Sequence, residues 1–413
     1  MSRRHAWVAA LLAAGLTVRL SYGLMRPPQG PGQALADPDG YVGLASSFAR
    51  SWTLSDSSGR PSAMREPVYP IALGLAFKAL GHNYGAMLAL HGLLSILSLG
   101  LMFVLGRRFF GEAVAFASLT VGAFYPPFIF YFSQALRETT MVSLGLLSLW
   151  SVIKLNDDGK ARDFAAAGIC SALAGLTNTV FLPFGLAAPI AACLLAGDKV
   201  RALGRVACYL GIMLPLYALW PLRNYSAFGS WIMGSTAGAG STFYIHLVIP
   251  EDVAGTPAQN DIVARDPVFS TAPKMMSPAE SERFYWRAGL RYVRENPLTY
   301  ARLLAWRIFR DFWRIVPRPR NYGISFQTLK WISLLSDGWI VPLGMFGLIF
   351  LGLRSRELLW GRLFVCCVVA PFALIITMIR YRLSIMPLLI ILACAVLHRS
   401  ASALWPPAKT TAA

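Results

Sequence analysis

The stretch Tyr84–Leu105 reads YGAMLALHGLLSILSLGLMFVL and contains no charged residue. An α-helix needs about 20 consecutive apolar residues to cross the hydrocarbon core of a bilayer, so this stretch predicts a membrane-spanning helix. The composition agrees with that prediction. The 413 residues are 56% hydrophobic and 14% charged, whereas a soluble domain carries roughly a quarter charged residues. We therefore predict an all-α polytopic membrane protein.

Apolar segments of similar character recur along the chain and predict about ten transmembrane helices. Prolines inside several of them are compatible with this prediction, because membrane helices tolerate proline. The segments are Trp7–Met25, Tyr84–Leu105, Ala113–Tyr131, Leu136–Ile153, Phe164–Thr177, Val180–Leu195, Leu203–Trp220, Trp339–Leu353, Leu363–Ile379 and Leu383–Leu397. We expect the whole chain, residues 1–413, to form one membrane domain.

Basic residues recur in every second connection between these segments, for example at Arg107 with Arg108 and at Lys199 with Arg201. Cytoplasmic loops carry such an excess. The alternation places both termini in the cytoplasm and two long segments, residues 26–83 and 221–338, outside, where we expect function. The basic residues behind the net charge of +18 fall in short connections and juxtamembrane segments, and not in one soluble patch. They therefore indicate membrane lipids and phosphates as partners, and not nucleic acid.

The six cysteines all lie in apolar segments, without the spacing of a metal site or a disulfide framework, and are expected to pack. His91 and His246 are isolated and are expected to make packing or polar contacts. The sequence contains no GxxxxGK[ST], GxSxG or HExxH motif. An ATP-driven pump, a serine hydrolase and a zinc protease therefore have no motif support.

Two carboxylates stand in the first outer segment, in the sequence Asp37-Pro38-Asp39-Gly40-Tyr41. They precede a predicted helix that runs from Tyr41 to Arg50. A carboxylate at the outer surface can act as a general base that takes the proton of a substrate hydroxyl, typically worth about 10²–10⁴-fold in rate. In the alternative interpretation, Asp37 or Asp39 only caps the helix.

Arginines at outer positions oppose the positive-inside trend. They are Arg65, Arg223, Arg380 and Arg382. A guanidinium can form paired charge-assisted hydrogen bonds with phosphate oxygens, so these residues are candidates for a phosphate site. The alternative is that they reach lipid headgroups, as Arg19 in the first helix is expected to do.

Glu138 lies at the outer end of the third and fourth predicted helices, next to Arg137. Ionisable residues at or inside the membrane boundary are functional candidates, so Glu138 is a candidate for binding substrate or a metal. A structural ion pair is the alternative. That pair is not expected between Arg137 and Glu138, because adjacent residues on a helix do not face each other.

Five motifs in this order resemble the GT-C superfamily of membrane glycosyltransferases, particularly its aminoarabinose-transferase-like and protein O-mannosyltransferase-like branch. The resemblance spans nearly the whole chain and implies a GT-C-like helical bundle. The motifs are Asp37-Pro-Asp39-Gly-Tyr41, Arg65-Glu-Pro-Val-Tyr69-Pro70, Leu105-Gly-Arg-Arg-Phe-Phe-Gly111, Arg223-Asn-Tyr225-Ser-Ala-Phe-Gly229 and Arg380-Tyr-Arg-Leu-Ser-Ile-Met-Pro387.

This resemblance also implies roles for single residues. Asp37, four residues before Tyr41, matches the catalytic base, but Pro38 separates it from Asp39, which remains a rival. Arg65 matches the residue that binds the carrier phosphate, with Arg223 and Arg380 or Arg382 as helpers. Glu138 stands at the place of an acidic residue near the second outer loop. Tyr41 and Tyr69 are further substrate or metal candidates, and the motifs leave a divalent metal requirement open.

The expected activity is inverting transfer of a sugar from a polyprenyl-phosphate donor to a hydroxyl of a lipid, glycan or protein acceptor. The resemblance places it at the extracytoplasmic face of the inner (plasma) membrane, in the cell envelope. One alternative is a lipid-linked saccharide carrier or flippase, which needs the basic sites but no base. Another is a structural or assembly subunit of an envelope complex.

Overall fold

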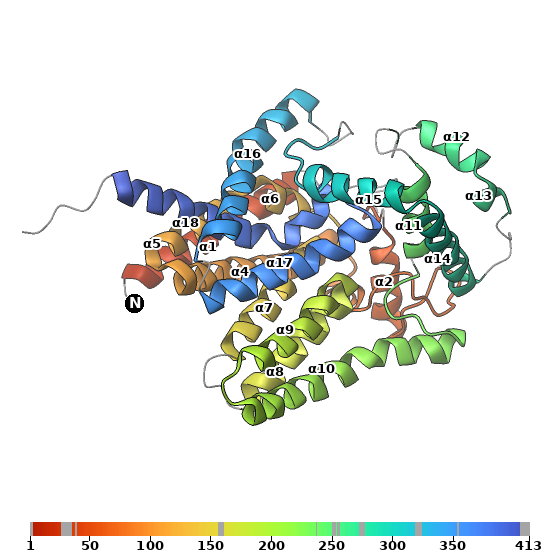
Figure 1. Cartoon of the computed structure of the whole chain (residues 1–413), viewed down its shortest axis with the longest axis horizontal. Coiled ribbons are helices and arrows are strands. Elements are labelled where there is room, and N and C mark those ends of the chain that lie inside the picture. The colour runs from red at the N-terminus through yellow and green to blue at the C-terminus, as the bar shows by residue number, and fades with distance from the viewer. Residues whose placement is uncertain are drawn as a thin grey trace, which may run out of the picture.

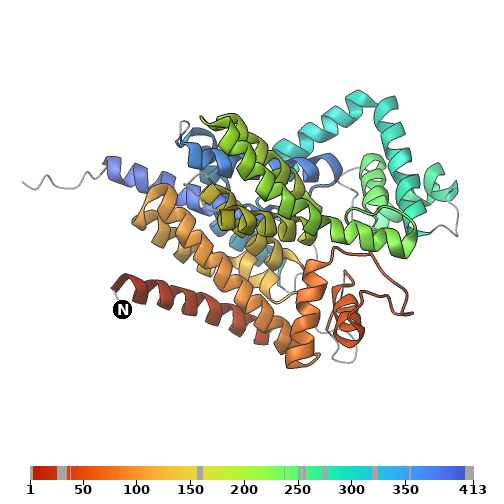
Figure 2. The same cartoon turned by 90° about the horizontal axis from the view of Figure 1, so that it is seen from below.

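The computed structural model describes residues 3–25, 35–37, 39–155, 161–236, 238–249, 253, 257–271, 277–318, 324–352 and 355–404. Most of these residues lie in helices that form an elongated bundle with a smaller helical layer at one end (Figures 1 and 2). An antiparallel bridge joins Ser55 and Pro61 in the loop after the second helix.

The bundle contains helices at all ten predicted positions. They are α1 (Arg3–Met25), α4 (Tyr84–Phe110), α5 (Glu112–Phe124) with α6 (Pro126–Phe132), α7 (Glu138–Leu155), α8 (Ala161–Thr177), η2 (Thr179–Phe181) with α9 (Leu182–Leu195), α10 (Lys199–Phe228), α16 (Phe326–Phe350), α17 (Arg356–Ile375) and α18 (Met386–Leu404). In the described part of the chain, six of them are long and apolar enough to span a membrane, or seven with the α5–α6 pair. The chain is thus a multi-pass membrane protein, and the predicted count of ten is confirmed in part.

The smaller layer is built from the two long segments predicted outside and from the connection between α17 and α18. It contains α2 (Tyr41–Ser51), α3 (Val68–Leu80), α11 (Ala239–Val248), α12 (Pro257–Arg265), α13 (Pro267–Thr271), α14 (Pro278–Glu295), α15 (Pro297–Trp306), the π-helix η3 (Arg307–Asp311) and the 3-10 helix η4 (Ile379–Ser384). The sequence of the second long segment predicts a helix from Pro278 to Glu295, and α14 has these bounds. Ser277 and Glu280 form a reciprocal capping box at its start.

Two predicted boundaries were wrong in this layer. The α10 helix continues through Pro221 to Phe228, and α16 begins at Phe326, where Ser325 caps it, so the connection is shorter than residues 221–338. Over residues 300–315, arginines alternate with Leu, Trp and Phe at helical spacing, which predicts a single amphipathic helix in the membrane interface. Instead, α15 ends at Trp306 and a π-turn follows, which buries Arg307 and Asp311.

The bend of 49° between α5 and α6 explains the position of Arg19. Pro126 and Pro127 have no N–H, so the carbonyls of Gly122 and Ala123 lack their usual helical donors. The guanidinium of Arg19 replaces both donors, at 2.9 Å from Gly122 O and 2.7 Å from Ala123 O. Arg19 is buried. The prediction that it reaches the headgroups was therefore wrong, because its guanidinium donates to two carbonyls at the break between α5 and α6.

Candidate functional site

The chain turns sharply into α2 at Gly40. Gly40 has φ +78°, and a Cβ there would lie 1.9 Å from Met64 Cε. Only glycine adopts this conformation without strain. The backbone N–H of Gly43, in the first turn of α2, donates to Asp37 Oδ2 at 2.8 Å. The predicted capping role of Asp37 is therefore present.

The second carboxylate oxygen of Asp37 has a different environment. Asp37 Oδ1 is buried and has no hydrogen-bond partner among the described residues. A buried acceptor without a partner is rare in folded proteins and calls for an explanation such as a catalytic role. The two interpretations of Asp37 are thus compatible, because one oxygen anchors α2 and the other is free to accept a proton.

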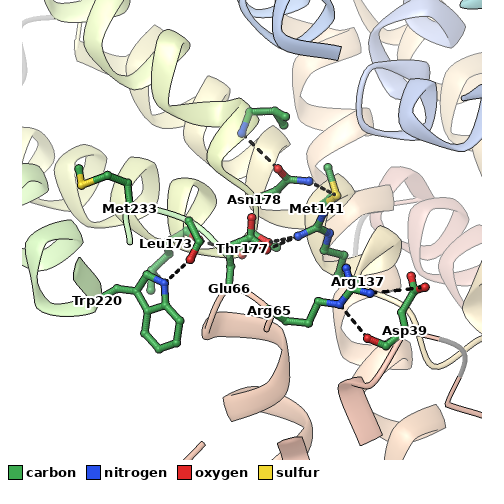
Figure 3. Close-up of polar contacts among 12 residues, drawn as sticks. Asp39, Arg65, Glu66, Arg137, Met141, Leu173, Thr177, Asn178, Trp220 and Met233 are labelled. Atoms are coloured by element: carbon green, nitrogen blue, oxygen red, sulfur yellow. Dashed lines mark hydrogen bonds and ion pairs between the residues drawn. The ribbon is translucent and has the colours of Figure 1, made fainter. Parts of the chain in front are cut away.

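Asp39 lies between two of the predicted arginines. Arg65 Nε donates to the Asp39 main-chain oxygen at 2.7 Å, and its Nη2 lies 3.7 Å from Asp39 Oδ1, as Figure 3 shows. The Arg65 guanidinium also stacks over the Tyr41 ring, 5.2 Å from its centroid. On the other side, Arg380 Nη1 approaches Asp39 Oδ2 to 3.5 Å.

Arg380, in η4, connects Asp39 to Glu138 at the start of α7. Its Nε lies 3.7 Å from Glu138 Oε1 but has no hydrogen-bond partner in the described residues. Glu138 is 6% exposed, and its Oε2 is buried without a partner there. It borders a cavity of about 20 Å³, which is room for roughly one water molecule. Arg380 thus links two carboxylates by long contacts that leave donors available.

A buried ion pair behind this cluster was not predicted. Arg137 donates to the Glu66 carboxylate and lies 3.5 Å from the Thr177 carbonyl (Figure 3). Glu66 is 5% exposed. The expectation that Arg137 pairs elsewhere than with Glu138 is confirmed. The only local sign of this ion pair in the sequence was that an acidic residue, Glu66, precedes the apolar and proline residues 67–70.

Tyr41 and Tyr69 lie next to this cluster. Their rings meet edge to face with centroids 5.1 Å apart, and the Tyr69 hydroxyl lies 3.1 Å from His91 Nε2. His91 Nδ1 must donate to the Phe132 carbonyl at 2.7 Å, so Nε2 accepts from Tyr69. Burial raises the pKa of Tyr69, and the nearby charges of Glu138 and Asp37 raise it further. The Tyr69 hydroxyl therefore stays protonated at neutral pH and donates a hydrogen bond to His91.

Arg223 and Arg382 are held by other partners. Arg223 donates to the carbonyls of Leu54 and Ser62 at 2.9 and 3.0 Å, and thereby fixes the loop after α2 to the end of α10. Arg382 is 1% exposed and donates to Asp337 at 2.6 Å. Their predicted phosphate contacts stay predictions, because the protein itself uses these guanidinium groups in the present conformation.

The cluster therefore contains Asp37, Asp39, Arg65, Glu138 and Arg380 over the two tyrosines. No three His, Cys, Asp or Glu side chains lie close enough to hold a metal ion in the described part of the chain. Two cations and three carboxylates meet at a site where several polar atoms lack partners. Such an arrangement can bind an anion and accept a proton within the same small region.

Residues 61–223 match a family described as dolichyl-phosphate-mannose-protein mannosyltransferase. This part of the chain is therefore similar to that family of membrane glycosyltransferases. Its fold is similar to that of the oligosaccharyltransferase AglB from Archaeoglobus fulgidus in complex with an inhibitory peptide and a dolichol-phosphate, with 13% identity and a TM-score of 0.56. That alignment covers 98% of this chain and 53% of the other.

Two further structures are similar to this chain. The apo form of the Archaeoglobus enzyme aligns with 13% identity and a TM-score of 0.58, over 97% of this chain and 51% of its own. ArnT from Cupriavidus metallidurans, bound to undecaprenyl phosphate, has 15% identity and a TM-score of 0.44, over 96% of this chain and 79% of its own. The chain thus spans about half the length of the Archaeoglobus enzyme. No curated protein matches it.

Proposed function

We propose that this protein transfers a sugar from a polyprenyl-phosphate donor to an acceptor hydroxyl on the extracytoplasmic face, with inversion at the anomeric carbon. The observation that carries the proposal is Arg380, which lies between Asp39 and Glu138 with an unpartnered Nε. The Archaeoglobus enzyme that shares the fold was solved with a dolichol-phosphate. That ligand supports a lipid-linked phosphate as the donor of this chain.

In the proposed reaction, the acceptor oxygen attacks the anomeric carbon while the bond from that carbon to the carrier phosphate breaks. The acceptor proton passes to Asp37 Oδ1, the carboxylate oxygen without a partner. Negative charge develops on the leaving phosphate, where Arg65 and Arg380 stabilise it by electrostatic preorganisation. Asp39 positions the two arginines, and Glu138 holds Arg380 from the other side.

We further propose that the ten helical positions are ten crossings, with both termini on the cytoplasmic side. The α7, α8 and η2–α9 segments would cross although they are short, because neighbouring helices bury much of their surface. This orientation puts the cluster of Asp37, Asp39 and Arg380 at the extracytoplasmic boundary. A plasma (inner) membrane location follows from the donor class.

The test uses purified protein in lipid with a panel of polyprenyl-phosphate sugars and measures sugar release. The variants are Asp37→Asn, Asp39→Asn and the double variant. An asparagine at position 37 can still accept the Gly43 N–H, so α2 keeps its anchor while the base is lost. We expect a loss of about 10²–10⁴-fold in turnover for Asp37→Asn, typical for removal of a general base. Unchanged sugar transfer by a well-folded double variant would contradict the proposal.

A lipid-linked saccharide carrier is the second candidate, and one observation favours it. Both predicted bases take part in structural contacts, Asp37 with α2 and Asp39 with the arginines. A carrier would bind the same donors and move them between vesicle leaflets without cleavage. Donor binding and leaflet exchange without sugar release, across the whole panel, would favour the carrier.

A further inference from the structure

A cavity of about 290 Å³ lies at the end of the bundle where α10 begins, between α8, α9, α10 and α17. Its inner wall includes Phe164, Tyr209 and Trp360, which are all buried. Arg201 and Arg205 also line it, and the Arg201 side chain is 79% exposed. The cavity therefore combines an aromatic, apolar interior with cationic groups toward solvent.

This cavity is separate from the candidate site. Arg201 and Arg223 lie on the same helix, 22 residues apart, which at 1.5 Å per residue corresponds to roughly 33 Å. This distance is close to the thickness of the hydrocarbon core, about 30 Å. Arg223 contacts the loop after α2, at the other end of α10, as Figure 1 shows for the two helices. In the proposed orientation, on which this inference rests, the cavity and the candidate site belong to opposite membrane boundaries.

We propose that the cavity binds an anionic phospholipid of the cytoplasmic leaflet, with its phosphate at Arg201 and Arg205 and an acyl chain against Trp360. Basic pockets between transmembrane helices at the cytoplasmic side favour anionic headgroups. The Asp198–Arg201 contact of 3.1 Å involves two exposed side chains. An exposed pair of this kind contributes little stability, so a phosphate can replace Asp198 as the partner of Arg201.

The test measures quenching of Trp360 by lipids with brominated acyl chains. The full-length protein is reconstituted with either brominated phosphatidylglycerol or brominated phosphatidylcholine, and the Trp360→Phe signal is subtracted because the chain has 12 tryptophans. We expect the Trp360 component to be quenched at a lower mole fraction of phosphatidylglycerol. Arg201→Gln and Arg205→Gln should each weaken this preference about fivefold, as expected for one basic residue at the membrane surface.

Arg162→Gln is the matched control, because Arg162 is also 79% exposed beside an aspartate but does not line the cavity. It should keep the lipid preference. Equal quenching of Trp360 by both lipids would overturn the proposal. So would an effect of Arg162→Gln equal to that of Arg201→Gln, or stronger displacement of the brominated lipid by undecaprenyl phosphate than by phosphatidylglycerol. Native mass spectrometry of the wild type and the Arg201→Gln, Arg205→Gln double variant gives a second readout, in which only the wild type should retain phosphatidylglycerol.

Discussion

The two oxygens of the Asp37 carboxylate have different environments. Oδ2 accepts from the α2 backbone and Oδ1 has no partner in the described residues. Such a division keeps the proposed base at a fixed distance from the helix while one oxygen stays available. The side chain is therefore held in place before any substrate binds, as efficient proton transfer requires.

Arg380 gives the sharpest test at the scale of a residue. Replacing it with glutamine should raise the KM for a polyprenyl-phosphate donor and lower kcat, because the phosphate loses a charged donor in both the bound and the transition state. A charge-assisted hydrogen bond is worth about 1.5–3 kcal/mol, so kcat/KM should fall roughly 10–150-fold. Steady-state sugar release measures both constants.

Arg60→Gln is the control for Arg380→Gln, because Arg60 is an exposed arginine of the same outer region, next to Asp56. It should leave both constants within about fivefold, since exposed contacts contribute about 0–1 kcal/mol at most. A loss of activity in Arg60→Gln equal to that in Arg380→Gln would mean that general surface charge, and not the site, attracts the donor.

At the scale of an element, the break between α5 and α6 depends on a residue from α1. Arg19→Met leaves the carbonyls of Gly122 and Ala123 without donors in the apolar interior. Each orphaned carbonyl should cost about 1–3 kcal/mol, so the Tm of the purified protein should fall. Reversible unfolding in mixed micelles gives the free energy difference.

The prolines allow this contact to be tested by rescue. In a Pro126→Ala, Pro127→Ala background, two new backbone N–H groups can reach the Gly122 and Ala123 carbonyls, so α5 and α6 can join and Arg19 becomes less necessary. We expect Arg19→Met to cost less in that background than in the wild type. Equal costs in the two backgrounds would show that Arg19 acts by another route, such as its contact with Gly15.

At the scale of the whole molecule, the proposed orientation predicts which positions a membrane-impermeant thiol reagent reaches in intact cells. In a chain without native cysteines, Ser58→Cys should be labelled from outside, because it lies in the exposed loop after α2. Lys199→Cys, at the start of α10, should be labelled only after the membrane is opened. Labelling of both positions from outside would contradict the ten crossings.

The sequence was sufficient to locate the helices, because a run of apolar residues is a local property. Each predicted segment has a helix at its position, and α14 has its predicted ends. Helix boundaries were missed where polar residues continue a helix, as at Phe326–Gly338 in α16. The bend at Pro126 was missed for a related reason, since proline is tolerated in membrane helices and its effect depends on Arg19, a distant residue.

The candidate site was predictable in its parts but not in its assembly. Asp37, Asp39, Arg65, Glu138 and Arg380 could be selected because charged residues at a membrane boundary are conspicuous. Hydropathy contains no information on which of them meet. The same limit explains why Arg382 and Asp337 could not be paired in advance, and why the Glu66–Arg137 pair was missed.

The contact between Arg19 and α5 also imposes an order on biosynthesis. Arg19 enters the membrane with the first helix, whereas Ala123 follows 104 residues later. At about 5–20 residues per second, this interval lasts roughly 5–20 seconds. A lone arginine at the centre of a membrane helix costs about 2.5–3.5 kcal/mol, so the first helix is less stable in the bilayer until the α5 carbonyls reach Arg19.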